Sequence, residues 1–174
     1  MAAAEKPTIQ QQVDDLIGGP QYALTQANKD AALTPILREL CRDVARRCPG
    51  YGRFLDKFGG DLDSWRSPAD APPLPVSMFK RFLLAAVPPE KIVRELHSSS
   101  TTGRDPSRII IDKTTAFRQA RALVAILKEH LGTRRRPYLV LDCADAAAAG
   151  DSLTARGAAI RGVANFASET VYAM

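Results

Sequence analysis

A run of small and hydroxyl-bearing residues stands out in this sequence as a place where chemistry can occur. It consists of Ser98, Ser99, Ser100, Thr101, Thr102 and Gly103. Small side chains leave backbone N–H groups unobstructed, and hydroxyls add hydrogen-bond donors without bulk. Because a loop that turns back on itself can aim several such donors at one anion, the run predicts a phosphate-binding loop.

Two features in and next to the run support this interpretation. Arg104 and Arg108 supply positive charge, and the guanidinium of Arg108 can contact a phosphate through two N–H groups. Gly103 permits a positive φ where the loop must reverse direction. The alternative is a mobile surface turn, because clusters of Ser, Thr, Gly, Asp and Pro usually form loops. Composition alone favours the surface turn.

The run matches neither of two widespread nucleotide-binding patterns. The Walker A loop needs a Gly-Lys pair, and no such pair occurs in this sequence. The dinucleotide pattern G-x-G-x-x-G is also missing. If the run binds phosphate, it belongs to another class of loop.

The segments around the run predict regular structure that would hold it in place. Ile109–Asp112 is expected to be a buried strand, because it is rich in β-branched residues, and Val93–His97 is a second candidate strand. An amphipathic helix is expected over Thr114–Leu131, capped by Asp112 or Thr114 and ended by Gly132. The run would therefore connect two strands.

The N-terminal part of the chain predicts helices and a proline-rich connector. One helix is expected over Thr8–Ile17. A second is expected to have Thr34 as its N-cap and Pro35 at its first position, and to end at Pro49. Residues 59–75 contain several prolines and predict a connector without helix or central strand.

The C-terminal part alternates between strand and helix patterns. Tyr138–Leu141 and Thr170–Tyr172 predict strands, and Ser152–Ala167 predicts a helix between them. Strands separated by helices are typical of an α/β fold with some parallel pairing. We therefore expect an α/β fold in which helices pack on a mixed sheet.

Composition excludes several classes of protein. The chain has 174 residues, of which 45% are hydrophobic and 25% charged, as in an ordinary globular domain. No apolar run approaches the roughly 20 residues that span a bilayer, and no secretory signal is evident. The net charge of +5 comes with one dense basic cluster, Arg134–Arg136, and no nucleic-acid-reading motif. We expect neither a membrane span nor a nucleic-acid partner.

The cysteines favour a reducing compartment. Cys41, Cys48 and Cys143 are too few and too scattered for a disulfide framework, which favours the cytoplasm. The helical pattern predicts that Cys41 and Cys48 are core residues. None of the three forms a C-x-x-C pair or lies near a histidine in a metal-binding spacing, so we expect no metal site built by the protein alone.

Other polar residues each have two interpretations. Lys80 is either a second cation for the phosphates or a structural side chain whose stem covers its apolar neighbours, and the structural role is favoured. His97 either contacts the ligand or bonds to the backbone at a strand end. Asp142 and Asp145 follow a strand, where α/β ligands bind, but a lone Asp there more often forms a turn.

Several segments in a fixed order resemble one protein family. They are Pro75–Lys80, Ser98–Gly103, Pro106–Ile109 and Arg136–Asp142, and Thr115, Gln119 and Ala155–Gly157 are also similar. Together they resemble the N-terminal half of LuxE-type acyl-protein synthetases, which are part of the adenylate-forming superfamily. The resemblance implies a truncated N-terminal adenylation subdomain over residues 30–174, preceded by a helical arm over residues 1–29.

The resemblance also implies an activity and its ligands. Family members use ATP, with Mg²⁺, to convert a carboxylic acid to an acyl-adenylate and then transfer the acyl group to a thiol. An acyl acid, such as a fatty acid, or an aryl acid would be the substrate. The resemblance implies that Ser98–Gly103 surround the β- and γ-phosphates, with Arg108 in or near the same site. No catalytic residue is assigned.

Two departures from the family pattern keep other functions open. Ser100 occupies a position where the family has glycine. The chain is also expected to be a fragment, or one part of a split enzyme whose other half a partner supplies. A non-catalytic partner subunit derived from the adenylation fold, or a domain without activity of its own, are the alternatives.

Overall fold

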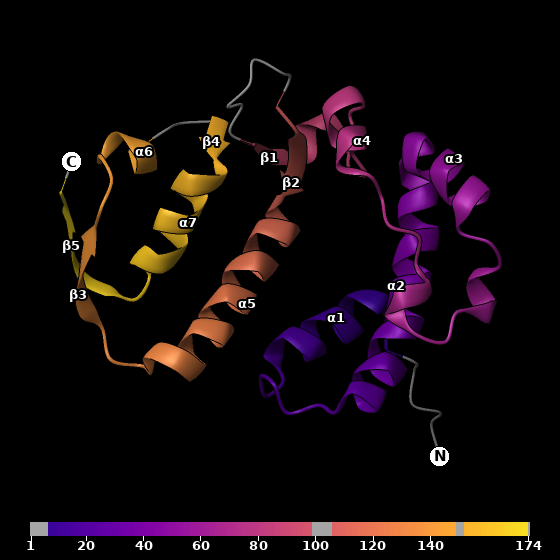
Figure 1. The fold of residues 1–174 in the computed structure, drawn as a ribbon, viewed down its shortest axis with the longest axis horizontal. Helices are drawn as coiled ribbons and strands as arrows, with labels where there is room; N and C mark the ends of the chain where they lie inside the picture. Colours follow the sequence, from indigo (N-terminus) through magenta and orange to yellow (C-terminus); the bar gives the residue numbers. More distant parts are fainter. Residues whose placement is uncertain (1–6, 99–105, 149–151, 174) are drawn as a thin grey trace. The chain divides into compact units, whose positions relative to one another are not determined.

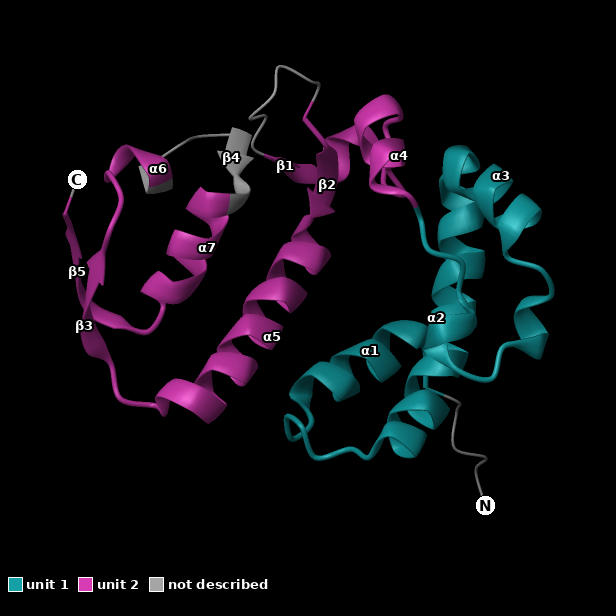
Figure 2. Ribbon diagram, in the orientation of Figure 1, with its two compact units in different colours: residues 1–74 teal, residues 75–174 magenta. Residues whose placement is uncertain are grey.

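The computed structural model describes residues 7–98, 106–148 and 152–173. The chain forms two compact units, residues 1–74 and residues 75–174 (Figure 2). The first unit is helical, and the second contains helices and two small sheets (Figure 1). In the part of the chain that is described, no helix combines the length and apolar character that a membrane span requires.

Three helices build the first unit. They are α1 (Ile9–Gly18), α2 (Gln26–Arg47) and α3 (Pro49–Phe58), and two 3-10 turns follow at Leu62–Ser64 and Pro68–Asp70. The expected first helix is confirmed within one residue at each end. Thr8 caps it, because its hydroxyl accepts a hydrogen bond from the backbone N–H of Gln11.

Helix α2 begins earlier than the sequence predicted. Thr25 is its N-cap, and Pro35 lies inside the helix, so the prediction that Thr34 caps it was wrong. The Thr34 hydroxyl instead donates to the carbonyl of Asp30 at 2.6 Å. The helix accommodates Pro35 while it buries Thr34, Ile36 and Cys41, and Ile36 lies on a different side of the helix from the other two. Residues 29 and 30, where the arm was expected to end, both lie within α2.

Helix α3 was not predicted. Cys48 separates it from α2, and Pro49 occupies its first position, where a missing N–H costs nothing. Phe54 and Leu55 are the buried residues of this helix. The proline that marked the end of one helix in the sequence is therefore also the start of the next.

The core of the first unit forms around Trp65. This side chain is 3% exposed and packs with Cys41 and Leu55. Its indole N–H donates to the carbonyl of Gly59 at 3.1 Å, which satisfies its polar atom inside the core. The Tyr51 hydroxyl donates to the Cys41 sulfur at 3.2 Å, and burial raises the pKa of Tyr51 well above its usual value. Cys41 and Cys48 are buried, as predicted.

Two small sheets characterise the second unit. In the first, β1 (Ile92–His97) lies between β2 (Arg108–Asp112), which is antiparallel to it, and β4 (Ser152–Thr154), which is parallel. The second sheet pairs β3 (Arg136–Val140) with β5 (Ala167–Tyr172) in parallel. The expected α/β fold with mixed strand pairing is confirmed.

Helices precede and connect these strands. They are α4 (Val76–Arg81), α5 (Lys113–Leu131), α6 (Asp145–Ala148) and α7 (Ala155–Ala164), with a 3-10 turn at Pro89–Lys91. The expected helix from Ser152 was wrong in its first turn, because residues 152–154 form a strand that pairs with β1. Helix α5 is confirmed. Asp112 caps it, and Gly132 ends it with φ of 72°.

Strand β2 is less buried than predicted. Ile111 is 1% exposed, but Ile109, two residues earlier on the same face of the strand, is 46% exposed, so the expected burial is confirmed at Ile111 and not at Ile109. β2 lies at the edge of its sheet.

We predict that Leu55→Ala destabilises the first unit by about 2–5 kcal/mol, because it opens a cavity beside Trp65. Trp65 is the only tryptophan in the chain, so its fluorescence in a urea titration reports this unit alone. Leu33→Ala is the matched control, because Leu33 is 38% exposed on α2. Equal midpoint shifts for the two variants would contradict the assigned core.

We predict a pH-dependent stabilising effect of Asp112. Hydrogen bonds from Thr115 lower the pKa of Asp112 in the folded chain. The carboxylate therefore stabilises the fold above its unfolded pKa of about 3.9, and this effect is lost as the pH falls through the lower, folded value. Asp112→Ala should lower the free energy of unfolding by about 1 kcal/mol at pH 7.

Urea denaturation followed by far-UV circular dichroism measures this effect. The loss in free energy of unfolding caused by Asp112→Ala should be as large at pH 6 as at pH 7, and it should shrink below about pH 4. Glu129→Ala is the control, since Glu129 is an exposed acidic residue near the other end of the same helix. A deficit that stays constant down to pH 2.5 would refute the role of the Asp112 carboxylate.

Candidate functional site

The hydroxyl-rich run connects β1 to β2, as predicted. His97, the last residue of β1, lies opposite Arg108, the first residue of β2. Ser98 and Ser107 close the base of the connection: the N–H of Ser98 donates to the carbonyl of Ser107 at 3.2 Å. The N–H of Ser107 donates to the hydroxyl oxygen of Ser98 at 2.9 Å. The two ends of the connection are therefore held together as a hairpin.

The structure places only part of the predicted site. Ser98 and Arg108 are described, whereas Ser99, Ser100, Thr101, Thr102 and Gly103 lie outside the described residues. Ser107, which sequence reasoning did not single out, is 7% exposed, and its backbone N–H is satisfied by the hydroxyl oxygen of Ser98. Ser107 is therefore a buried residue immediately before the start of β2.

Three charged or titratable side chains gather at this base. Oε1 of Glu95 lies 3.4 Å from Nε of Arg108 and 3.4 Å from Nε2 of His97. The Arg108 side chain remains 44% exposed. Glu95 therefore holds Arg108 through one edge of its guanidinium. Residues 95 and 97 share one face of a strand, so strand periodicity was the available signal for Glu95.

His97 thus pairs with a neighbouring side chain, whereas the sequence offered a ligand contact or a backbone bond. Lys80 lies on α4, which contacts β2, and its side chain is exposed. Arg108 is the predicted cation that the structure brings to the base of the hairpin.

A second ion pair joins two other strand ends. Oδ2 of Asp142 lies 3.0 Å from Nε of Arg156. Oδ1 of Asp142 accepts a hydrogen bond from the N–H of Cys143 at 2.8 Å, so this Asp does form a local turn. Cys143 is an exposed free thiol, and Asp145 begins α6. Sequence reasoning noted both acidic residues but not the pairing with Arg156.

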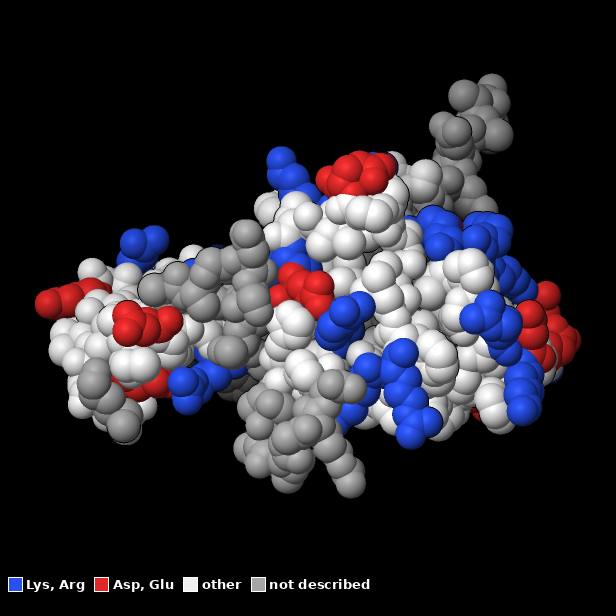
Figure 3. Space-filling model, turned by 90° about the horizontal axis from the view of Figure 1, so that it is seen from above, with Lys and Arg blue, Asp and Glu red and all other residues white. Residues whose placement is uncertain are grey.

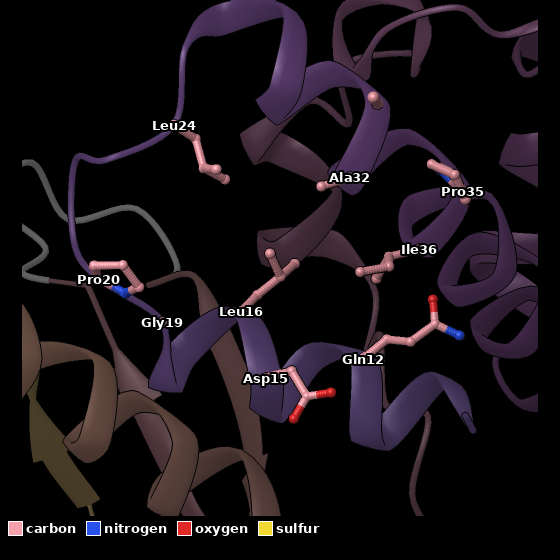
Figure 4. A pocket seen from close by; sticks show the side chains of 10 residues that line it. Gln12, Asp15, Leu16, Gly19, Pro20, Leu24, Ala32, Pro35 and Ile36 are labelled. Carbon is pink, nitrogen blue, oxygen red and sulfur yellow. The ribbon is translucent and has the colours of Figure 1, made fainter. Parts of the chain in front are cut away.

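A pocket in the first unit does not suit a phosphate ligand. It has a volume of about 530 Å³ and lies between α1 and α2 (Figure 4). Leu16, Leu24 and Ile36 contribute apolar lining, and Asp15 is the ionisable lining residue. A carboxylate repels a polyphosphate, and the lining offers no cation to offset it.

Basic side chains lie among acidic and uncharged ones in the view of Figure 3. Within the described ranges, no group of three or more His, Cys, Asp and Glu side chains is arranged to hold a metal ion. The base of the β1–β2 hairpin therefore remains the candidate site.

Comparison with protein families identifies the chain. The model of acyl-protein synthetase, LuxE, matches residues 3–174. The chain belongs to the LuxE acyl-protein synthetase family. Comparisons with curated proteins and with solved structures give no match. The LuxE match includes the helical arm as well as the segments that carried the resemblance, and it spans both compact units.

Proposed function

We propose that this LuxE family chain supplies the ATP-phosphate-binding part of a synthetase that activates a carboxylic acid and passes its acyl group to a thiol. The observation that carries the proposal is the closed β1–β2 hairpin, with Arg108 held at its base by Glu95. Family membership supplies the reaction class. The acid is an acyl or aryl carboxylate.

The proposed reaction has two steps. A carboxylate oxygen of the acid attacks the α-phosphorus of ATP, and the bond from that phosphorus to the β-phosphate oxygen breaks. Pyrophosphate leaves with the bonding electrons, and an acyl-adenylate forms. A thiol sulfur then attacks the acyl carbon, gives up its proton, and displaces AMP.

Negative charge accumulates on pyrophosphate in the first step, and the proposed site stabilises that charge. In this proposal, backbone N–H groups and hydroxyls of Ser98–Gly103 hydrogen-bond the β- and γ-phosphates. Arg108 contacts the same phosphates through the part of its guanidinium that does not face Glu95. Prearranged donors of this kind stabilise a leaving group more than mobile water does.

In this proposal, Mg²⁺ enters the site bound to the phosphates of ATP. This ion is usually bound by one or two carboxylates together with substrate phosphates and waters. When bound, it neutralises phosphate charge. Glu95 already pairs with Arg108 and His97, so we assign no Mg²⁺ ligand among the residues at the base of the hairpin.

A non-catalytic partner subunit is the second candidate function, and Ser100 favours it. A side chain at a position where the family uses glycine can prevent the loop from closing on phosphate, if that position needs a positive φ. Pyrophosphate exchange separates the two functions. Exchange that depends on an added acid supports the enzyme, whereas the absence of both ATP binding and exchange with any added acid supports the non-catalytic subunit.

We predict that Arg108→Gln weakens ATP binding about tenfold or more, because a charged hydrogen bond contributes about 1.5–3 kcal/mol. Isothermal titration calorimetry of the full chain with MgATP measures this loss. Arg135→Gln is the matched control, because Arg135 is exposed in the segment before β3 and its substitution removes the same charge. Equal ATP affinity in the two variants, or no ATP binding by the unmodified chain, would refute the proposed site.

We predict that Ser100→Gly strengthens ATP binding. If this position takes a positive φ, removing the Cβ relieves about 1–2 kcal/mol, equivalent to a roughly fivefold to thirtyfold tighter dissociation constant. Ser99→Gly is the control for a general increase in backbone freedom. An unchanged or weaker affinity in Ser100→Gly, or an equal gain in Ser99→Gly, would count against a strained position at Ser100.

A further inference from the structure

The ion pair between Asp142 and Arg156 connects the ends of two strands from different sheets. Asp142 lies just beyond the end of β3, and Arg156 lies just beyond the end of β4. Their Oδ2 and Nε atoms are 3.0 Å apart. The side chain of Asp142 is 17% exposed and is fixed further by the N–H of Cys143. Arg156 is therefore held in place by a partly buried carboxylate that cannot move freely.

The pairing leaves much of the Arg156 side chain facing solvent. Its side chain is 69% exposed, and the contact with Asp142 uses Nε. Most of the N–H donors of a guanidinium are on its two terminal nitrogens. A fixed guanidinium with an exposed terminal edge is suited to bind a carboxylate or a phosphoryl group through two parallel hydrogen bonds.

Strand pairing places Arg156 beside the candidate site. β4 is parallel to β1, and Thr154 lies opposite His97, so both strands end at the same edge of the sheet. On the other side of β1, Arg108 also lies opposite His97. Neighbouring strands are about 4.8 Å apart, so the backbone at Arg108 and at Thr154 is separated by roughly 10 Å. Ligands of α/β proteins commonly bind at such carboxyl ends.

We propose that Arg156 binds the reacting oxyanion, which is either the carboxylate of the acid or the α-phosphoryl group of ATP, and that Asp142 is its positioning residue. This assignment rests on the proposed function. The two reacting groups are both anions, and their mutual repulsion opposes the attack. A cation that contacts one of them lowers that repulsion. Arg108 and Arg156 then act on opposite ends of the reacting system.

A purely structural ion pair is the competing explanation. A structural pair whose arginine is exposed contributes little to stability, and its loss would weaken the binding of all ligands to a similar extent. The two explanations therefore differ in ligand dependence rather than in stability. A binding experiment with ligands that represent separate parts of the reaction distinguishes them.

The experiment is isothermal titration calorimetry of the full chain with pyrophosphate, AMP, octanoate and phenylacetate. Arg156→Gln should weaken binding of AMP, or of the two carboxylates, about tenfold or more, as expected for loss of a charged hydrogen bond. Loss for AMP assigns the α-phosphoryl group, and loss for the carboxylates assigns the acid. Pyrophosphate affinity should stay within about twofold of that of the unmodified chain, because its assigned contacts lie at Arg108.

Three further variants test the roles of the two side chains. Arg156→Lys should recover part of the affinity, because it keeps the charge but loses the fork. Asp142→Asn should show the same ligand pattern as Arg156→Gln with a smaller loss. Arg135→Gln, the charge control, should leave all four affinities unchanged.

The assignment is overturned if Arg156→Gln binds AMP and both carboxylates as the unmodified chain does, or if the unmodified chain binds none of them. An equal loss for pyrophosphate also overturns it, because the effect would then be a general change in fold or charge. The proposed function fails on a different arm: the unmodified chain binds no pyrophosphate, or Arg108→Gln leaves that affinity unchanged.

Discussion

Strand β1 is paired along both of its edges, and the arrangement of the candidate site depends on that pairing. The antiparallel pairing with β2 places Arg108 next to His97. The parallel pairing with β4 places the start of α7 on the other side of the same strand end. Backbone hydrogen bonds, which the chain must satisfy wherever they are buried, thus bring together residues that are far apart in sequence. Ion pairs with carboxylates then fix the orientation of the Arg108 and Arg156 side chains.

Each cation at this edge is held by a carboxylate. Glu95 lies against Arg108, and Asp142 lies against Arg156. A guanidinium that is already oriented loses less conformational freedom when it binds an anion than a mobile one does. In both pairs the contact uses Nε, so the terminal nitrogens are the ones available to a ligand. The LuxE family chain therefore has two arginines near the end of β1, each oriented by a carboxylate.

Local patterns predicted most elements of the second unit but not their partners. Hydrophobic periodicity and caps identified α5, and the run of β-branched residues identified β2, because these signals depend on nearby residues. The strand at Ser152–Thr154 was read as helix because it is short and gains its hydrogen bonds from β1, which lies far away in sequence. Pro35 was misplaced for a related reason: burial of side chains on more than one side of α2 outweighs the local cost of a proline. Arg108 was found from charge beside the hydroxyl-rich run, whereas Glu95 and the pairing of Arg156 with Asp142 required the strand register.

The central claim is that ATP binds at the base of the β1–β2 hairpin, and an NMR titration of the full chain with MgATP tests it most directly. The account predicts saturable shifts of the backbone amide signals of Ser98, Ser107 and Arg108. It also predicts that the indole N–H signal of Trp65, in the core of the other unit, does not move. Shifts confined to residues of the first unit, or no shifts at millimolar ATP, would contradict the account.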